Sequence, residues 1–115
     1  MEENELKEES INQMGPETHI FKSTGQYLGF IKNGTLYSRD GNYLGWSEGK
    51  YIWDASGNFR GELTERNNNF YILKNILAVP PIPKSPKSGA LAPTIPNPRP
   101  NISPIPLQIH LKDGF

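Results

Sequence analysis

The stretch YSRDGNYLGW, residues 37–46, occurs three times in related form in this chain. FKSTGQYLGF (21–30) precedes it and WDASGNFRGE (53–62) follows it, so that successive copies begin sixteen residues apart. Each copy starts with an aromatic residue and has glycines four and eight residues later, which gives two sets, Gly25, Gly41 and Gly57, and Gly29, Gly45 and Gly61. An internal period of this kind indicates a repeated structural unit.

A second series of turn residues alternates with the first set of glycines. It consists of Asn33-Gly34, Glu48-Gly49 and the NNN run at 67–69, and short runs of β-branched and aromatic residues lie between the turns, which is typical of β-hairpins. Turns about eight residues apart leave no room for a crossover helix, so we expect neighbouring strands to pair antiparallel in a meander. The sequence predicts an all-β fold of about eight short strands, at roughly 18–23, 26–31, 35–38, 42–47, 50–54, 58–63, 69–73 and 76–79.

An altered fourth copy, FYILKNILAV at 70–79, is expected to complete the array. Tyr71 follows Trp53 by eighteen residues, and Asn75 takes the first glycine position because asparagine is the next best residue at positive φ. The second set of glycines falls within predicted strands, where glycine is destabilising unless a close approach requires it. This indicates repeats that are arranged radially, with strands that converge at these glycines.

Composition divides the 115 residues into four segments. Residues 1–17 are acidic and almost without apolar side chains, so we expect them to be disordered. Residues 18–79 form the four-repeat β domain, and residues 80–106 hold ten of the eleven prolines, which predicts extended polyproline-type chain. Around the last segment, 107–115, Ile and Leu alternate with polar residues, so residues 107–111 are expected to dock on the domain as a strand.

Charge and cysteine content exclude several function classes. The net charge is zero and no segment is strongly basic, so no nucleic-acid partner is expected. The chain has no cysteine, hence no disulfide framework and no thiolate site. Neither a signal peptide nor a long apolar run is visible, which predicts a cytoplasmic protein that does not insert into membranes.

Catalytic and metal-binding patterns are also missing. His19 and His110 match no metal-ligand spacing, and Asp40 and Asp54 fall at turns, where a carboxylate caps its own backbone. We therefore expect no enzyme, no metal and no cofactor, with a small hydrolase as the least favoured alternative.

The candidate binding residues are aromatic and aliphatic side chains of the repeats. Aromatic residues at equivalent positions of a β array either form stacking platforms or fill the core that a small domain needs, and the core is favoured. Leu28 and Phe30 share a strand face on which the third copy has Arg60 and Glu62, so this face is expected to be partly exposed and to meet the tail or a partner. The candidate residues are Leu28, Phe30, Leu44 and Trp46 on that face, together with Trp53 and Tyr37.

The proline-rich tail has two interpretations. Its PxxP elements (80–83, 83–86 and 93–96) are typical ligands of SH3-like domains. A strap over the protein's own apolar face, or a tether, is favoured because Ile82, Leu91, Ile95 and Ile102 lie among the prolines.

The repeat resembles that of a known family. Sixteen-residue units of the form aromatic-x-x-x-Gly-x-aromatic-Leu-Gly-aromatic, followed by a proline-rich tail, are similar to those of the small bacterial four-fold β-flower proteins over about residues 18–83. The resemblance implies a pseudo-symmetric β array of four hairpin-like petals and no particular activity. Arg60 and Glu62 depart from the unit. Choline-binding cell-wall repeats are similar to WSEGKYIWDASGNFRG (46–61) but are longer.

The sequence thus predicts a non-enzymatic β-repeat module that acts through binding or assembly. A protein partner or self-association is the main hypothesis. Binding of carbohydrate or of the cell envelope through Trp46, Trp53 and Tyr37 is the alternative.

Overall fold

The computed structural model describes residues 16–115, so the predicted disordered segment 1–17 lies outside the described residues except for its last two. The strands are β1 (Thr18–Phe21), β2 (Tyr27–Lys32), β3 (Thr35–Ser38), β4 (Tyr43–Glu48), β5 (Tyr51–Asp54), β6 (Phe59–Arg66), β7 (Asn69–Asn75) and β8 (Leu111–Asp113). The first seven lie within about three residues of their predicted bounds. In residues 16–115 the structure has no helix with the length and apolarity that crossing a bilayer requires.

The predicted strand at 76–79 is wrong, because the chain turns there. The Ala78 amide donates to the Asn75 carbonyl over 3.3 Å, and the Leu77 amide donates to the Asn75 side-chain oxygen over 2.9 Å. Asn75 ends β7 and does not have the positive φ expected of it; among the described non-glycine residues, Asn33, Asn67 and Asn68 do. Pro80 and Pro81 then prevent any return to the sheet.

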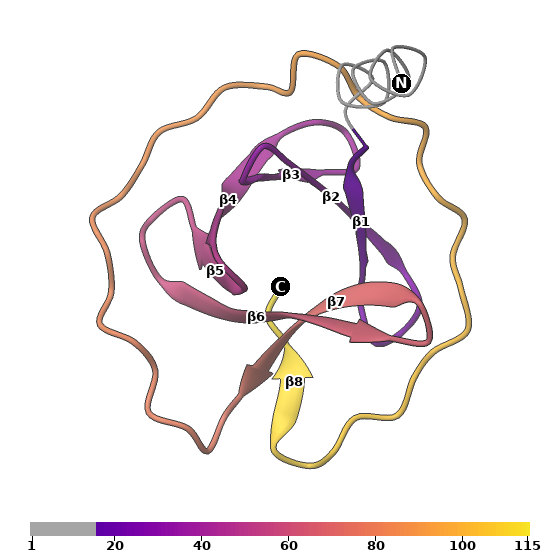
Figure 1. The fold of residues 1–115 in the computed structure, drawn as a ribbon, viewed down its shortest axis with the longest axis vertical. Coiled ribbons are helices and arrows are strands. Elements are labelled where there is room, and N and C mark those ends of the chain that lie inside the picture. Colours follow the sequence, from indigo (N-terminus) through magenta and orange to yellow (C-terminus); the bar gives the residue numbers. More distant parts are fainter. Residues whose placement is uncertain (1–15) are drawn as a thin grey trace, which may run out of the picture.

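Strands β1 to β7 form a closed barrel (Figure 1). Consecutive strands pair antiparallel, as the turn spacing predicts. The closing pair is parallel, and joins Ile20 to Phe70 and Phe21 to Tyr71. A pure antiparallel meander is therefore corrected to a seven-strand mixed barrel, to which β8 adds antiparallel along β7.

The repeat appears in the structure as a repeated irregularity of the pairing. The register shifts between Ile20 and Phe21, between Leu36 and Tyr37, and between Ile52 and Trp53, at positions sixteen residues apart. Each shift places one extra residue on one of the two paired strands, and such a bulge bends the strand and increases its twist. Three such bends at equal intervals give the sheet the curvature that its closure requires.

The fourth unit is longer than the others. Trp46 pairs with Trp53 in the second unit, and Glu62 pairs with Leu73 in the next, so Leu73 stands twenty residues after Trp53. Because the β6–β7 hairpin is extended, Leu73 takes the position that the sequence assigned to Tyr71.

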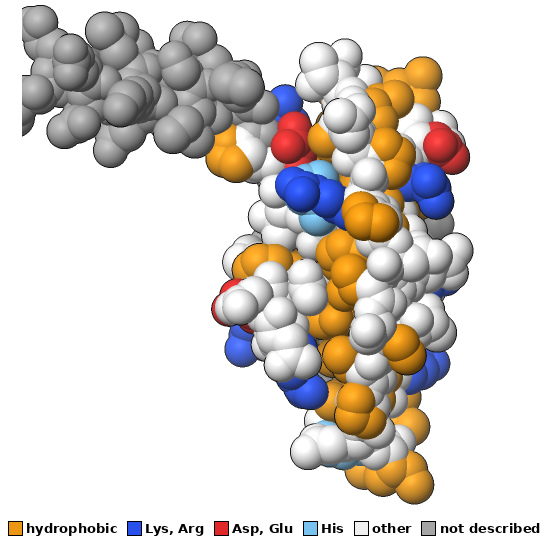
Figure 2. All heavy atoms as spheres, turned by 90° about the vertical axis from the view of Figure 1, so that its right-hand side faces the viewer, with side chains coloured by type: hydrophobic (Ala, Val, Ile, Leu, Met, Phe, Trp, Pro, Cys, Tyr) orange, Lys and Arg blue, Asp and Glu red, His pale blue; other side chains and the backbone are white. Residues whose placement is uncertain are grey.

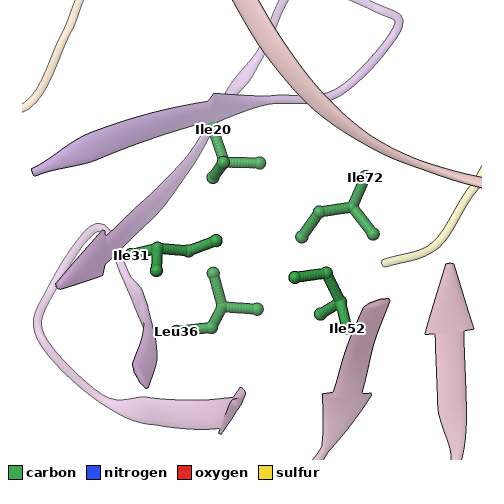
Figure 3. Packing of buried hydrophobic residues seen from close by; sticks show 5 residues of the cluster. All are labelled: Ile20, Ile31, Leu36, Ile52 and Ile72. Carbon is green, nitrogen blue, oxygen red and sulfur yellow. The ribbon is translucent and has the colours of Figure 1, made fainter. Parts of the chain in front are cut away.

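The central core consists of five aliphatic residues that point toward one another from different strands (Figure 3). They are at most 9% exposed and comprise Ile20, Ile31, Leu36, Ile52 and Ile72. Burial of one such side chain stabilises a fold by about 1.5–3 kcal/mol. Three of these residues, Ile20, Leu36 and Ile52, precede the aromatic residue that opens each copy, so the period sets the core as well as the turns.

The second set of glycines permits a close approach of neighbouring strands, as predicted. A Cβ atom at Gly45 would overlap the Trp53 carbonyl oxygen and come within 2.9 Å of the Asp54 Cα. Gly29 meets the Tyr37 carbonyl in the same way, and Gly61 meets that of Leu73 at 2.6 Å.

We expect Gly45→Ala to lower the free energy of unfolding by about 3 kcal/mol, because backbone atoms of β5 cannot yield to the added methyl group. The matched control is Gly49→Ala, where φ is 60° but nothing lies within 4 Å of an added Cβ, so that only a conformational cost of about 1 kcal/mol applies. Urea denaturation measures both variants. An equal loss in the two variants would show that the close approach does not matter.

Candidate functional site

Residues 80–106, here called the strap, run around the outside of the barrel from the end of β7 to the approach of β8 (Figure 1). Strap amides donate to the carbonyls of the turn glycines in reverse chain order. Lys84 donates to Gly57 over 2.8 Å, and further along Ala92 donates to Gly41 and Ile102 to Gly25, both over 2.9 Å. The strap is therefore attached to one equivalent turn in each of the first three copies.

Two further amides strengthen this attachment. Lys87 donates to the Ala55 carbonyl over 3.1 Å, and Ile105 donates to the Ser23 carbonyl over 2.8 Å. Proline has no amide hydrogen, so the strap can be held only where its prolines are interrupted. The anchor points are thus five of the non-proline positions, which the spacing of the prolines did not reveal.

The turn glycines have a second role that sequence reasoning missed. Gly41 has a φ of 83°, which suits a turn, but its Cα also faces the strap. A Cβ there would come within 2.7 Å of the Ile95 side chain, and Cβ atoms at Gly25 and Gly57 would overlap the carbonyls of Ile102 and Lys84. These glycines therefore allow the strap to lie directly on the turns.

The aromatic belt is the set of candidate residues Phe30, Tyr37, Trp46 and Trp53, which pair across neighbouring strands. Phe30 and Tyr37 stack with their ring centroids 5.3 Å apart. Phe30, Trp46 and Trp53 are 0%, 5% and 2% exposed, and Tyr37 is half-buried. The expectation of a partly exposed face is therefore wrong for Phe30 and Trp46, which are buried.

The other two candidate residues lie on the core side. Leu28 and Leu44 are partly buried and pack against the central core. The structure therefore separates them from Phe30 and Trp46, with which simple alternation along the strand had grouped them. The bulges between strands account for the difference, because an extra residue changes which face the following side chains share.

Two strap lysines cover the tryptophans. Lys84 Nζ lies 5.1 Å from the Trp53 ring centroid, and Lys87 Nζ lies 4.7 Å from that of Trp46. Glu48 joins these groups, because Lys84 Nζ donates to one carboxylate oxygen over 2.7 Å and Trp46 Nε1 donates to the other over 2.8 Å. An ammonium over an indole face is attracted by the ring quadrupole.

Most aliphatic side chains of the strap do not cover the barrel. Ile82, Leu91 and Ile95 are 87%, 69% and 52% exposed, whereas Ile102 packs on the aromatic cluster of Phe21 and Tyr27. These four residues were the reason to favour a strap or a tether; of the four, Ile102 alone packs on a buried cluster, while Ile95 lies against Gly41. The strap is attached through its main chain, so this attachment does not require Ile82, Leu91 and Ile95 to be buried. Figure 2, which views the molecule from its edge, shows apolar side chains in a band along that edge.

The candidate catalytic groups have structural roles. His19 Nδ1 is 3.0 Å from the Tyr27 hydroxyl, and burial lowers the pKa of His19, as does the nearby Arg99 to a smaller extent. Asp54 caps its turn by accepting the amides of Ser56 and Asn58. Within residues 16–115, no three side chains able to bind a metal come together.

The barrel, the sixteen-residue period and the attached strap are the features by which this chain can be compared with known families. The family model of the 4-fold beta flower protein matches residues 10–108, which include β1 to β7 and the strap. The chain belongs to this family. No curated protein and no solved structure matched the chain. Membership gives the β-flower chain its fold, while its function has to be argued from its own residues.

The Glu48 cluster of this β-flower protein gives a pH-dependent prediction. The hydrogen bond from Lys84, with a smaller one from Trp46, holds the pKa of Glu48 below its ordinary value of 4.5. The stabilisation from this cluster is therefore present above the unfolded pKa and is lost as the pH falls through the lower folded value. In Lys84→Met, the pKa of Glu48 should rise toward 4.5, as measured by a carbon-detected NMR titration of its carboxyl group.

The matched control is Lys50→Met, because Lys50 lies 3.9 Å from the carboxylate of Glu62 and forms no bond with Glu48. The pKa of Glu48 should not change in this variant. A Glu48 pKa that is the same in wild type and Lys84→Met would contradict the cluster.

Proposed function

We propose that this protein is a non-enzymatic interaction scaffold, in which the barrel holds the strap extended and presents its outer edge to a protein partner. One observation supports this above the others. The strap is bonded to the barrel through main-chain amides at Lys84, Ala92 and Ile102, while Ile82 and Leu91 face solvent.

The physical advantage of this arrangement is preorganisation. A free proline-rich chain loses conformational entropy when a partner orders it, and this loss weakens binding. Here the hydrogen bonds to the turn glycines order the strap before any partner arrives. Extended proline-rich segments are recognised in aromatic-lined grooves, and Pro83, Pro86 and Pro93 of the PxxP elements are exposed.

The repeat supports the same proposal. We interpret the barrel as four pseudo-symmetric petals, three of sixteen residues and a longer fourth. Equivalent turns then provide attachment points at regular intervals around the ring, and the anchors Lys84, Ala92 and Ile102 are eight and ten residues apart in the strap. The symmetry of the barrel thus provides evenly spaced attachment points for a strap whose own sequence does not repeat.

Carbohydrate binding through Trp46, Trp53 and Tyr37 has less support. A stacking platform needs a free ring face, and the two tryptophans are at most 5% exposed with Lys87 and Lys84 over their rings. Tyr51 is 40% exposed but lies edge-on to Phe59 without a second platform beside it among the described residues. We therefore keep the protein scaffold as the proposed function.

The test is affinity capture with full-length bait, followed by direct binding of the purified partner. Ile82→Asp/Leu91→Asp changes only outward-facing side chains, so we expect it to keep the fold and to weaken partner binding at least about tenfold. Ile109→Asp is the matched control, because Ile109 is 96% exposed but lies outside the strap. Equal capture by wild type and Ile82→Asp/Leu91→Asp would overturn the proposed function.

A further inference from the structure

Arg60 departs from the repeat because it contacts the C-terminus. In the first two copies the corresponding residues, Leu28 and Leu44, pack on the core. Arg60 instead donates Nε–H to the Gly114 carbonyl over 2.6 Å and holds its guanidinium carbon 4.4 Å from the Phe115 ring centroid. The charged side chain at this position therefore contacts the last residues of the chain and does not mark an open face.

Asp113 is bound by the turn of the first copy. One carboxylate oxygen accepts the Ser23 amide over 2.8 Å, and the other accepts the Ser23 hydroxyl over 2.6 Å. Both oxygens are used, so an amide side chain would lose one of the two bonds. A carboxylate on a one-carbon stem is what this position accommodates.

Gly114 is buried and has no room for a side chain. Its amide donates to the Ile72 carbonyl over 2.9 Å. A Cβ atom there would overlap the Arg60 carbonyl oxygen and lie 2.8 Å from Ile72 Cγ2. This position therefore selects glycine.

Phe115 completes the contact by packing against the central core. The chain end accordingly lies within the ring of strands in Figure 1. Pairing of β8 with β7, from Asn75–Leu111 to Leu73–Asp113, fixes the direction in which these three residues enter. We call this site, formed by Ser23, Arg60, Ile72 and the β7 edge, the C-terminal dock.

We propose that the C-terminal dock is a peptide-recognition site for a segment of sequence Asp-Gly-Phe, and that a second copy of this chain supplies this ligand by exchanging its strap and β8. The proposal does not depend on the partner of the strap's outer edge. Every contact described for the dock is available to an identical chain end from another molecule. Exchange of an identical element is a low-cost route to a dimer.

The beginning of the strap favours this occupant. Residues 79–83, VPPIP, here called the hinge segment, make no main-chain hydrogen bond to other described residues, so the chain can take another path between the turn after β7 and Lys84 without breaking one. Ile76, Leu77 and Val79 are 52–92% exposed beside this hinge segment. Clustered apolar side chains mark a contact surface, and a second chain that leaves through the same region would cover them.

The first experiment tests exchange with single cysteines, which is straightforward because the chain has none of its own. Full-length Ser23→Cys and Asp113→Cys proteins of different mass are equilibrated together at several concentrations and oxidised. We expect a disulfide between the two chains, with a yield that rises with concentration. The matched control replaces Ser23→Cys by Ser56→Cys, an exposed turn residue of the third copy, and should give only background.

The double variant Ser23→Cys/Asp113→Cys shows whether the two thiols can reach each other within one chain. If it forms its internal disulfide while the mixed single variants give no more product than the Ser56→Cys control, exchange is overturned. If it forms none, the placement of Asp113 on Ser23 is itself wrong, and the dock is overturned with it.

The second experiment tests recognition. Full-length Asp113→Ala/Phe115→Ala is expected to bind its own end weakly, because it lacks the Asp113 carboxylate and the Phe115 ring. A labelled peptide QIHLKDGF should therefore bind this variant and show a change in fluorescence anisotropy. Adding Arg60→Leu, which restores the residue type of the first two copies, should weaken this binding at least about tenfold. Replacing the peptide glycine by alanine should have a similar effect. Equal binding of both peptides, or no effect of Arg60→Leu, would overturn recognition by the dock.

Discussion

The hydrogen bonds between strap amides and turn-glycine carbonyls are the interaction on which the rest of the structure depends. A net contribution of about 0.5–1.5 kcal/mol is typical of one such bond, and Lys84, Ala92 and Ile102 make three of them at equivalent turns. They bring the strap lysines over the belt tryptophans and lead the chain back to β8. A β domain of about sixty residues has a small core. The strap enlarges the buried surface without adding a second layer of sheet.

This constraint also explains the composition of the strap. Prolines stiffen the chain and remove donors that would otherwise compete for water or for neighbouring edges. Five of the remaining amides donate to carbonyls of the barrel's turns, so a proline at Lys84 or Ala92 would remove an anchor. The glycines of the opposing turns complete the contact, because any Cβ there would push the strap away.

Much of the barrel could be predicted from the sequence, since turns, bulges and core residues share one period. The closing pair could not, because the parallel contact of Ile20 with Phe70 joins residues fifty apart and leaves no local pattern. The last strand lies at Leu111–Asp113, at the end of the alternation that indicated 107–111, since the chain first turns through a bond from the Leu111 amide to the Gln108 carbonyl. The length of the β6–β7 hairpin likewise shifted the assignments of Tyr71 and Asn75.

The sequence predicted where the candidate residues lie, but it did not predict how far their side chains are exposed. The sequence left open whether the tail or a partner meets the face of Trp46; in the structure Lys87 of the tail lies over the Trp46 ring and Lys84 over the Trp53 ring. Which strap side chains face the barrel depends on which strap amides donate to its carbonyls, and the sequence of the strap has no pattern that predicts this. Arg60 was noticed as a departure, yet its partner, Phe115, lies at the far end of the chain.

Residue-resolved amide hydrogen exchange of the full-length protein tests the attachment of the strap most directly. The account predicts that the amides of Lys84, Ala92 and Ile102 are protected, while those of Ile82 and Leu91, which have no partner among the described residues, exchange as in a free peptide. Exchange of all five amides at unprotected rates would contradict the attachment of the strap to the barrel.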